Sequence, residues 1–243
     1  MKNAFLILVL AIFIVSCHNQ ERVAENIPRK GMYAGEKVPL NQPELFAPGF
    51  ISTGLYTRDI TISPDGNEIF FGVIMGRSVF IMETHIENGI WTTPKVASFS
   101  GSDLWFDFEP HISPDGKRFF MLSTRPPEGM EPKPGWSYQN IWAMDKTENG
   151  WTEPYLLGEP ISTEQDEFYA SATLNGTLYF TRSSDVQKSA IWRSEMVDGN
   201  YSKPEKLVFN NDTTLEIYNS MIAPDESYII VCVNHINDSI DVP

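Results

Sequence analysis

Short runs of alternating apolar and polar residues, each interrupted by a turn signal, recur along the chain. Residues 60–71 hold Ser-Pro-Asp-Gly around Asp65 between two apolar segments, and residues 110–121 repeat this arrangement around Asp115, about fifty residues later. Proline presets φ and glycine accepts a positive φ, so each copy predicts a β-hairpin. Degraded copies follow at residues 172–180 and 222–230. The pattern therefore predicts the same hairpin four times.

A second pattern runs in phase with the first: a turn signal, an aromatic residue and, three residues later, a proline. The three copies are Trp91 with Pro94, Trp151 with Pro154, and Tyr201 with Pro204. Apolar segments such as 79–82 and 141–144 supply a third strand before each copy, and the Asn-Gly or Asp-Gly turn leads into a fourth. Four antiparallel strands in a period of about fifty residues predict an all-β fold, a β-propeller of four-stranded blades.

The first residues of the chain predict targeting rather than structure. Lys2 precedes an apolar run over residues 4–15, shorter than the roughly 20 residues that span a bilayer, so residues 1–17 are predicted to be a signal peptide. The end of this run, Ile-Val-Ser-Cys, resembles the lipobox of bacterial lipoproteins. The resemblance implies cleavage before Cys17, lipidation of its thiol and a lipid-anchored protein of the bacterial envelope, in the outer membrane and facing either the periplasm or the medium. An uncleaved anchor or a free thiol is the alternative.

Polar, aperiodic residues at 18–37 predict a flexible tether between the lipid and a propeller domain at residues 38–243. Within that domain, residues 43–52 align with the fourth strands of the later repeats. An isolated fourth strand leaves exposed edges unless it completes a blade from the far end of the chain. We therefore expect about three and a half blades here, a chain cut short at Pro243, and five or six blades in the intact protein; a four-bladed ring that lacks one strand is the alternative.

Charge and cysteine content narrow the possible partners. The formal net charge is −14, which excludes the basic footprint that nucleic-acid binding requires. Cys232 lies in an apolar segment that predicts a buried strand, and a single cysteine beyond Cys17 gives no disulfide framework. Neither a cofactor motif nor histidines and cysteines at metal-ligand spacing occur, so no cofactor or metal is predicted.

The Ser-Pro-Asp-Gly hairpins, each followed by an apolar-aromatic strand, resemble the TolB-type β-propeller repeat, a relative of the WD40 repeat. The resemblance covers about residues 40–235 and implies a structural role for Asp65 and Asp115, with no catalytic residue carried over. The repeat occurs in periplasmic scaffolds, peptidase lids, lyases and exported lipoproteins, so it implies the fold and leaves the function open. Sialidases also place Asp in propeller hairpins, but the glycines directly follow Asp65 and Asp115, which argues against a sialidase.

Candidate functional residues are those just before each predicted first strand, because first strands line the channel of a propeller. Six residues before each turn residue, and close by, lie acidic and aromatic side chains that predict binding of a glycan, peptide or envelope protein. These binding candidates are Asp59, Trp105, Asp107, Glu109, His111, Tyr169 and Asn219. For each residue, the alternative is a purely structural role, in which the side chain forms a hydrogen bond with a loop or a neighbouring blade.

An inserted segment over residues 125–138 falls between a second and a third strand. It is rich in proline and ends with Trp136 and Tyr138, so it is predicted to overhang the channel mouth as a further binding element; a tolerated surface insertion is the alternative. The leading hypothesis is a non-catalytic binding or scaffold module. The alternative is a carbohydrate-active enzyme, a glycoside hydrolase or lyase, with Asp59 and Glu109 as acid and base candidates.

Overall fold

The computed structural model describes residues 28–37, 41–184, 188–209 and 215–235. Apart from one short 3-10 helix, η1 (Met32–Gly35), the regular structure of these residues consists of antiparallel β-strands. The predicted signal peptide and Cys17 lie outside the described residues. In the described part of the chain, no helix is long and apolar enough to cross a membrane.

Four hairpin-based blades follow one another along the described chain, and β14 and β15 of the third blade form a separate two-stranded sheet. Blade 1 comprises β1 (Tyr56–Ile62), β2 (Glu68–Met75), β3 (Ser78–Glu87), β4 (Ile90–Trp91) and β5 (Lys95–Val96). Blade 2 comprises β6 (Asp107–Ile112), β7 (Arg118–Ser123), β8 (Asn140–Thr147), β9 (Gly150–Trp151) and β10 (Tyr155–Leu156). Blade 3 comprises β11 (Asp166–Ala172), β12 (Leu178–Ser183), β13 (Ala190–Ser194), β14 (Met196–Val197), β15 (Asn200–Tyr201) and β16 (Glu205–Lys206). Blade 4 contains β17 (Leu215–Ile222) and β18 (Ile229–His235).

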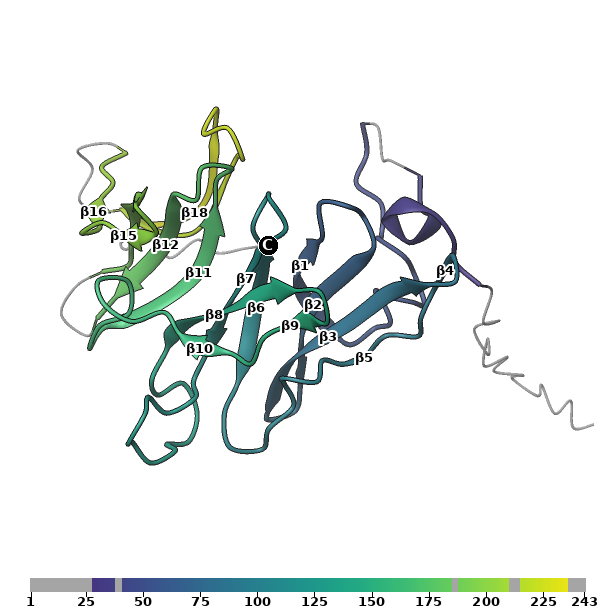
Figure 1. Cartoon of the computed structure of the whole chain (residues 1–243), viewed down its shortest axis with the longest axis horizontal. Helices are drawn as coiled ribbons and strands as arrows, with labels where there is room; N and C mark the ends of the chain where they lie inside the picture. The colour runs from purple at the N-terminus through teal and green to yellow at the C-terminus, as the bar shows by residue number, and fades with distance from the viewer. Residues whose placement is uncertain (1–27, 38–40, 185–187, 210–214, 236–243) are drawn as a thin grey trace, which may run out of the picture.

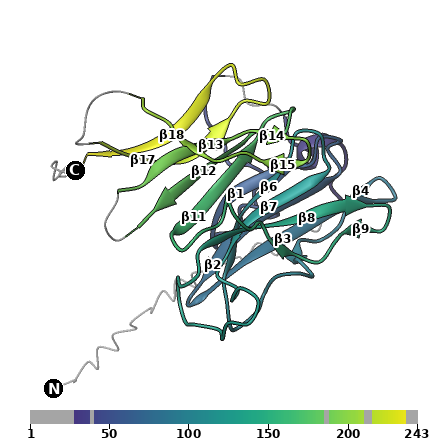
Figure 2. The ribbon, with the colours of Figure 1, turned by 60° about the vertical axis from the view of Figure 1, so that its left-hand side comes forward.

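The blades stand side by side in an arc, with their first strands innermost (Figures 1 and 2). Strand β1 packs beside β6, β6 beside β11, and β11 beside β17. In blades 1 to 3 the second and third strands pair outward in turn, and the edge strands β5, β10 and β16 pair with the third strands β3, β8 and β13. The chain is thus an all-β protein with the predicted β-propeller architecture. The third-strand segments 79–82 and 141–144 are confirmed within β3 and β8.

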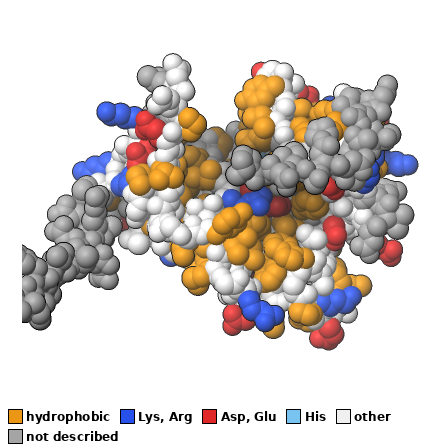
Figure 3. Space-filling model, turned by 180° about the vertical axis from the view of Figure 1, so that it is seen from behind, with side chains coloured by type: hydrophobic (Ala, Val, Ile, Leu, Met, Phe, Trp, Pro, Cys, Tyr) orange, Lys and Arg blue, Asp and Glu red, His pale blue; other side chains and the backbone are white. Residues whose placement is uncertain are grey.

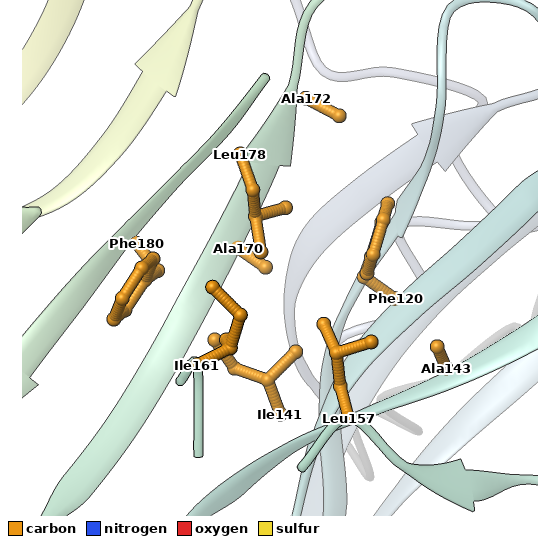
Figure 4. Packing of buried hydrophobic residues seen from close by; sticks show 9 residues of the cluster. All are labelled: Phe120, Ile141, Ala143, Leu157, Ile161, Ala170, Ala172, Leu178 and Phe180. Carbon is orange, nitrogen blue, oxygen red and sulfur yellow. The ribbon is translucent and has the colours of Figure 1, made fainter. Parts of the chain in front are cut away.

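Apolar layers between the blades hold the arc together. Between blades 2 and 3, the buried side chains of Phe120, Ile141, Leu178 and Phe180 pack with small alanines in one cluster (Figure 4). Between blades 1 and 2, Phe119 is fully buried, and its ring lies edge-on to that of Phe70 with centroids 5.0 Å apart. Successive residues of a strand point to opposite faces of its sheet. The period-2 pattern of the sequence therefore gives blades 1 to 3 two packed faces each.

The Ser-Pro-Asp-Gly turns are built as the repeat predicts. In blade 1, Ser63 Oγ donates to Asp65 Oδ1 at 2.5 Å, the Asn67 amide donates to the same oxygen at 3.1 Å, and Gly66 has φ +72°. These hydrogen bonds, with that from Ser63 first, lower the pKa of Asp65. Blade 2 repeats the geometry around Asp115. The aspartates therefore stabilise turns, because an ionised carboxylate accepts from both a hydroxyl and a backbone amide.

One hydrogen bond recurs at each joint between neighbouring first strands. Thr61 Oγ1 accepts from the Ile112 amide at 3.1 Å, His111 Nε2 accepts from the Ala172 amide at 3.0 Å, and Ser171 Oγ accepts from the Ile222 amide at 3.2 Å. The acceptor always lies on the earlier blade, and the donor is main chain on the later blade. Blade 4 has Met221 at the equivalent position. We call these three contacts the inter-blade joints.

Residues 28–37 and 41–52 pack against the face of blade 1 that points away from blade 2. Ala34 and Ala47 are fully buried there, packed with Phe71 and Trp91 in one apolar cluster, and the Trp91 indole donates to the Gly31 carbonyl at 2.8 Å. The second part of the predicted tether, residues 28–37, is thus packed against the domain. The expected strand over residues 43–52 is instead a turn with one isolated bridge between Pro48 and Ser52.

Blade 4 has one packed and one exposed face. Ile217, Ile229 and Val231 pack toward blade 3, whereas Ile230 on the other face remains 61% exposed. Cys232 lies on this second face and is exposed, so the prediction that it is buried is wrong. Its strand assignment is right; the sequence pattern could not show which face of β18 lacks a neighbour in the described residues.

Candidate functional site

Each of the four first strands contains a β-bulge at the same place. The register of each first strand with its partner shifts by one residue, so two residues of the inner strand oppose one of the second strand. The first residue of every bulge has a left-handed backbone: Asp59 has φ +56°, Glu109 +54°, Tyr169 +52° and Asn219 +50°. This conformation costs a non-glycine residue roughly 1–2 kcal/mol. It occurs at the four positions that the repeat spacing singled out, though inside the strands rather than just before them.

The bulges of blades 1 to 3 open onto a cavity of about 370 Å³ that runs along the inner strands. Residues 59–62, 109–112 and 169–172 line it, together with Met221 and Ile222 of blade 4. Pro64, Pro114 and Pro224 from the hairpin turns lie at its other end. The cavity therefore has an end with acidic and phenolic groups and a largely apolar remainder.

Asp59 is held by a neighbouring cation. Arg58 Nε donates to Asp59 Oδ2 at 2.7 Å, and the Arg58 guanidinium lies over the Phe108 ring, 5.3 Å from its centroid. Burial raises the pKa of Asp59, while Arg58 and a hydrogen bond with Tyr169 act in the opposite direction. Asp59 thus has its charge partner within the first strand of its own blade.

Glu109 is more deeply buried than Asp59, and no cation of the described residues pairs with it as closely as Arg58 pairs with Asp59. Its side chain is 8% exposed, and its Oε2 accepts from the Tyr169 amide at 2.8 Å. Burial, and secondarily the charge of Asp59, raise the pKa of Glu109 from 4.5 to about 8. At neutral pH this carboxyl is therefore protonated and can donate a hydrogen bond.

His111 serves the second inter-blade joint at the cavity wall. Its ring stacks on Phe120 with centroids 6.3 Å apart, and burial lowers its pKa from 6.5 to about 4. The ring is neutral above that pH, as its role as acceptor from the Ala172 amide requires. The structure therefore gives His111 a structural hydrogen bond in addition to a place in the cavity lining.

Asp107 and Trp105 lie outside the cavity. Asp107 is fully buried and paired with Arg125, whose Nε donates to Oδ1 at 3.1 Å and whose second nitrogen also donates to the Phe99 carbonyl. Trp105 stacks under the same guanidinium at 5.6 Å. Both residues fix the segment that enters blade 2. Blade 3 repeats this arrangement with Glu167 and Arg182.

The fourth bulge residue and the insertion also stand apart from the cavity lining. The backbone amide of Asn219 donates to Thr181 Oγ1 at 2.8 Å. The side-chain oxygen of Asn219, Oδ1, is buried and has no hydrogen-bond partner in the described residues. Trp136 packs edge-on against Phe106, with ring centroids 5.0 Å apart, and Lys133 lies over the ring of Tyr138. The inserted loop therefore packs over the start of β6 and does not line the cavity.

Sequence reasoning missed the apolar walls and the buried ion pairs. The proline of each Ser-Pro-Asp-Gly turn was assigned to the turn alone, although Pro64 and Pro114 also line the cavity. Asp107 and Glu167 occupy equivalent positions, two residues before a bulge, and each is followed by an arginine after or within the second strand. That spacing was the available signal for the ion pairs.

The described residues contain no group of three or more His, Cys, Asp or Glu side chains placed to hold a metal ion. The fold and the cavity together define a β-propeller with a partly apolar, acid-bearing channel.

Comparisons with known proteins add little beyond this class. No protein-family model and no curated protein sequence matches the chain. Among solved structures, TolB from Acinetobacter baumannii is 18% identical with a TM-score of 0.41, over 76% of this chain and 41% of that one. A putative TolB from Agrobacterium tumefaciens is 16% identical with a TM-score of 0.42, over 77% and 73% of the two chains.

An α-L-arabinofuranosidase from Podospora anserina, solved in complex with cellotriose, is 14% identical with a TM-score of 0.40, over 83% of this chain and 69% of that one. At these scores the similarities carry no conclusion about activity. The chain spans less than half of the Acinetobacter protein. The fold assignment rests on the blades described above.

Proposed function

We propose that this protein is a binding module and that its ligand site is the channel cavity bounded by the bulges of blades 1 to 3. The ligand would be a glycan, a peptide or an exposed segment of an envelope protein. One observation carries the proposal: Asp59, Glu109 and Tyr169 keep left-handed backbones while their side chains converge at one cavity. Strained non-glycine residues persist where the side chain has a use that glycine cannot serve.

The composition of the cavity supports binding. Apolar walls with a few converging polar groups are typical of sites for small ligands and for segments of partners, and 370 Å³ lies within the usual size range. The walls provide contact area, and the carboxyl and phenol groups provide orientation. The inner strands are rigid, since neighbouring blades are connected by the inter-blade joints.

An enzyme is the second candidate, and the state of Glu109 favours it. A carboxyl with a pKa of about 8 near a second carboxylate resembles the general acid of a glycosidase, in which two carboxyl groups act in different protonation states. In that case Glu109 would donate the proton to the leaving group, and Asp59 would act as the base or nucleophile. The pairing of Asp59 with Arg58 at 2.7 Å favours binding over this role, because the ion pair weakens the carboxylate as a base.

A glycan and peptide array on the purified chain tests the proposal. We expect a ligand whose affinity falls at least tenfold in Asp59→Asn and Glu109→Gln, because the first change removes a carboxylate charge and the second removes a carboxyl group that can ionise or give up its proton. Asp103→Asn and Glu87→Gln make the same chemical changes on exposed residues and should bind normally. Turnover that disappears in the cavity variants would establish the enzyme. Binding that survives both cavity variants would contradict the proposed site.

We further propose that the protein is held at a bacterial envelope through a lipid on Cys17, on the basis of the lipobox-like sequence. Mass spectrometry of the mature N-terminus should find an acylated cysteine, and Cys17→Ser should release the protein from the membrane fraction. An unmodified N-terminus with unchanged membrane partition of the variant would refute the anchor.

A further inference from the structure

One acidic group of the cavity has no ion-pair partner in the described part of the chain. Arg58 is paired with Asp59 at 2.7 Å and lies over the face of Phe108, and its charge lowers the pKa of Glu109 less than burial and Asp59 raise it. Glu109 has no ion-pair partner among the described residues. The cavity therefore contains one acidic group whose charge a ligand has to neutralise if that group is to ionise.

Glu109 also keeps an unused hydrogen-bonding position. The amide of Tyr169 is its one hydrogen-bond donor within the described residues, and it contacts Oε2 alone. The residue is 8% exposed and lines the cavity, and its other oxygen, Oε1, is not among the fully buried unpaired atoms, so it is open toward a ligand in the cavity. A buried carboxyl in this state is stabilised most by a cationic donor, because such a donor supplies both the charge and the missing hydrogen bond.

The remaining walls indicate what accompanies the cation. Ile60, Pro110 and Ala170 adjoin the acidic end, and the prolines of the turns continue the apolar lining. We infer that the cavity binds an ammonium group carried on an apolar chain, with Glu109 as the counter-ion and the walls of the channel around the chain. This inference rests on the proposed function and specifies its ligand. A lysine side chain of a partner and a small free amine share this chemistry.

Proton balance gives the inferred interaction a pH dependence. The groups that face Glu109 are Arg58 and Asp59 on β1, His111 on its own strand and Tyr169 on β11, while blade 4 contributes no titratable group to the lining. Binding an ammonium group converts the carboxylic acid to a carboxylate and releases one proton to solvent. Affinity for the cation should therefore rise as the pH approaches the pKa of about 8 of the free site.

Ligand-observed NMR on the full chain tests the inference with two matched pairs of probes. Benzylamine is compared with benzyl alcohol, and Nα-acetyl-lysine amide, which keeps its side-chain ammonium, with Nα-acetyl-norleucine amide, at pH 6 and pH 8. We expect at least one ammonium probe to bind tenfold or more tightly than its neutral partner, with affinity rising more than tenfold between the two pH values. Glu109→Gln should abolish both effects, and Glu87→Gln should change neither.

The probes also distinguish the two possible kinds of ligand, and they distinguish a failure of this inference from a failure of the proposed binding site. Preference for the lysine amide supports a partner side chain, and preference for benzylamine supports a small free amine. Equal binding of charged and neutral probes in the cavity would overturn the inference and leave the proposed binding site standing. Binding of no probe would overturn the inference, and the array then decides separately whether the cavity binds another ligand. Urea unfolding of Glu109→Gln verifies that the variant is folded.

Discussion

Replacing Arg182 with Met is expected to lower the free energy of unfolding by about 3–5 kcal/mol, the cost of leaving a buried charge without its partner. Arg182 Nε donates to Glu167 Oε1 at 2.8 Å, and the Glu167 side chain is fully buried. The same guanidinium donates to the carbonyls of Pro160 and Ile161, at 3.1 and 2.9 Å. The substitution therefore removes an ion pair and loosens the segment that enters blade 3. Urea denaturation of the purified chain measures the change.

Two controls separate the buried charge from the loss of the long side chain. The double variant Glu167→Leu/Arg182→Met should recover at least half of the loss, since an apolar pair of similar volume leaves no buried charge. Lys117→Met removes a long cationic side chain from an exposed ion pair with Asp115 and should cost no more than about 1 kcal/mol. A loss below about 1 kcal/mol in Arg182→Met would show that Glu167 is not a buried, ionised partner.

The change that Glu109→Gln makes in the free energy of unfolding should be more stabilising at pH 8 than at pH 4.5, by several kcal/mol. Burial raises the pKa of Glu109 from 4.5 to about 8, so between these pH values the folded state holds a proton that the unfolded state has lost. Stability of the unmodified protein then falls by about 1.4 kcal/mol per pH unit as pH rises through this window, and levels off above it. Glutamine has no proton to lose and removes this slope.

The measurement is urea unfolding of both proteins at half-unit steps from pH 4.5 to pH 9. His111 acts with the opposite sign, because its lowered pKa of about 4 makes stability fall as pH drops below its ordinary value of 6.5. It is present in both proteins, so their difference isolates Glu109. A difference that stays constant across the range would mean that the carboxyl titrates normally in the folded state.

The blades could be predicted from the sequence because the signals for them are local. A hairpin around Asp65 or Asp115 is determined by Pro, Asp and Gly within a few residues, and alternation of apolar residues assigns the flanking strands. The repeat then extended one hairpin to four. The two packed faces of blades 1 to 3 follow from the same alternation.

The coverage of blade 1 could not be predicted in the same way. Residues 43–52 match the other fourth strands in sequence, but Ala47 and Ile51 pack against the face of blade 1 instead of pairing as a strand. Which apolar surface a segment covers depends on contacts distant in the sequence. The burial of Ala34 near Trp91 has the same origin, since nothing local to residues 28–37 indicates a partner sixty residues away.

The sequence predicted where the candidate site lies, but only some of the residues that form it. Repeat spacing selected Asp59, Glu109, Tyr169 and Asn219, and the structure brings the first three to one cavity. Glu109 and Tyr169 give no signal of the bulge that orients them, because left-handed backbones favour glycine, asparagine and aspartate. The repeat spacing was a signal for pairing of Asp107 with Arg125, but the burial of the pair depends on contacts distant in the sequence.

The inter-blade joints also bear on how such a chain can be rearranged. Each joint asks for one acceptor side chain on the earlier blade, and threonine, histidine and serine all satisfy it, while the later blade contributes only main chain. At the first strands, a blade can therefore be duplicated or exchanged without a matched pair of polar side chains changing together. Duplication of a blade needs to preserve one acceptor side chain at each of these joints, while the residues at each bulge diverge.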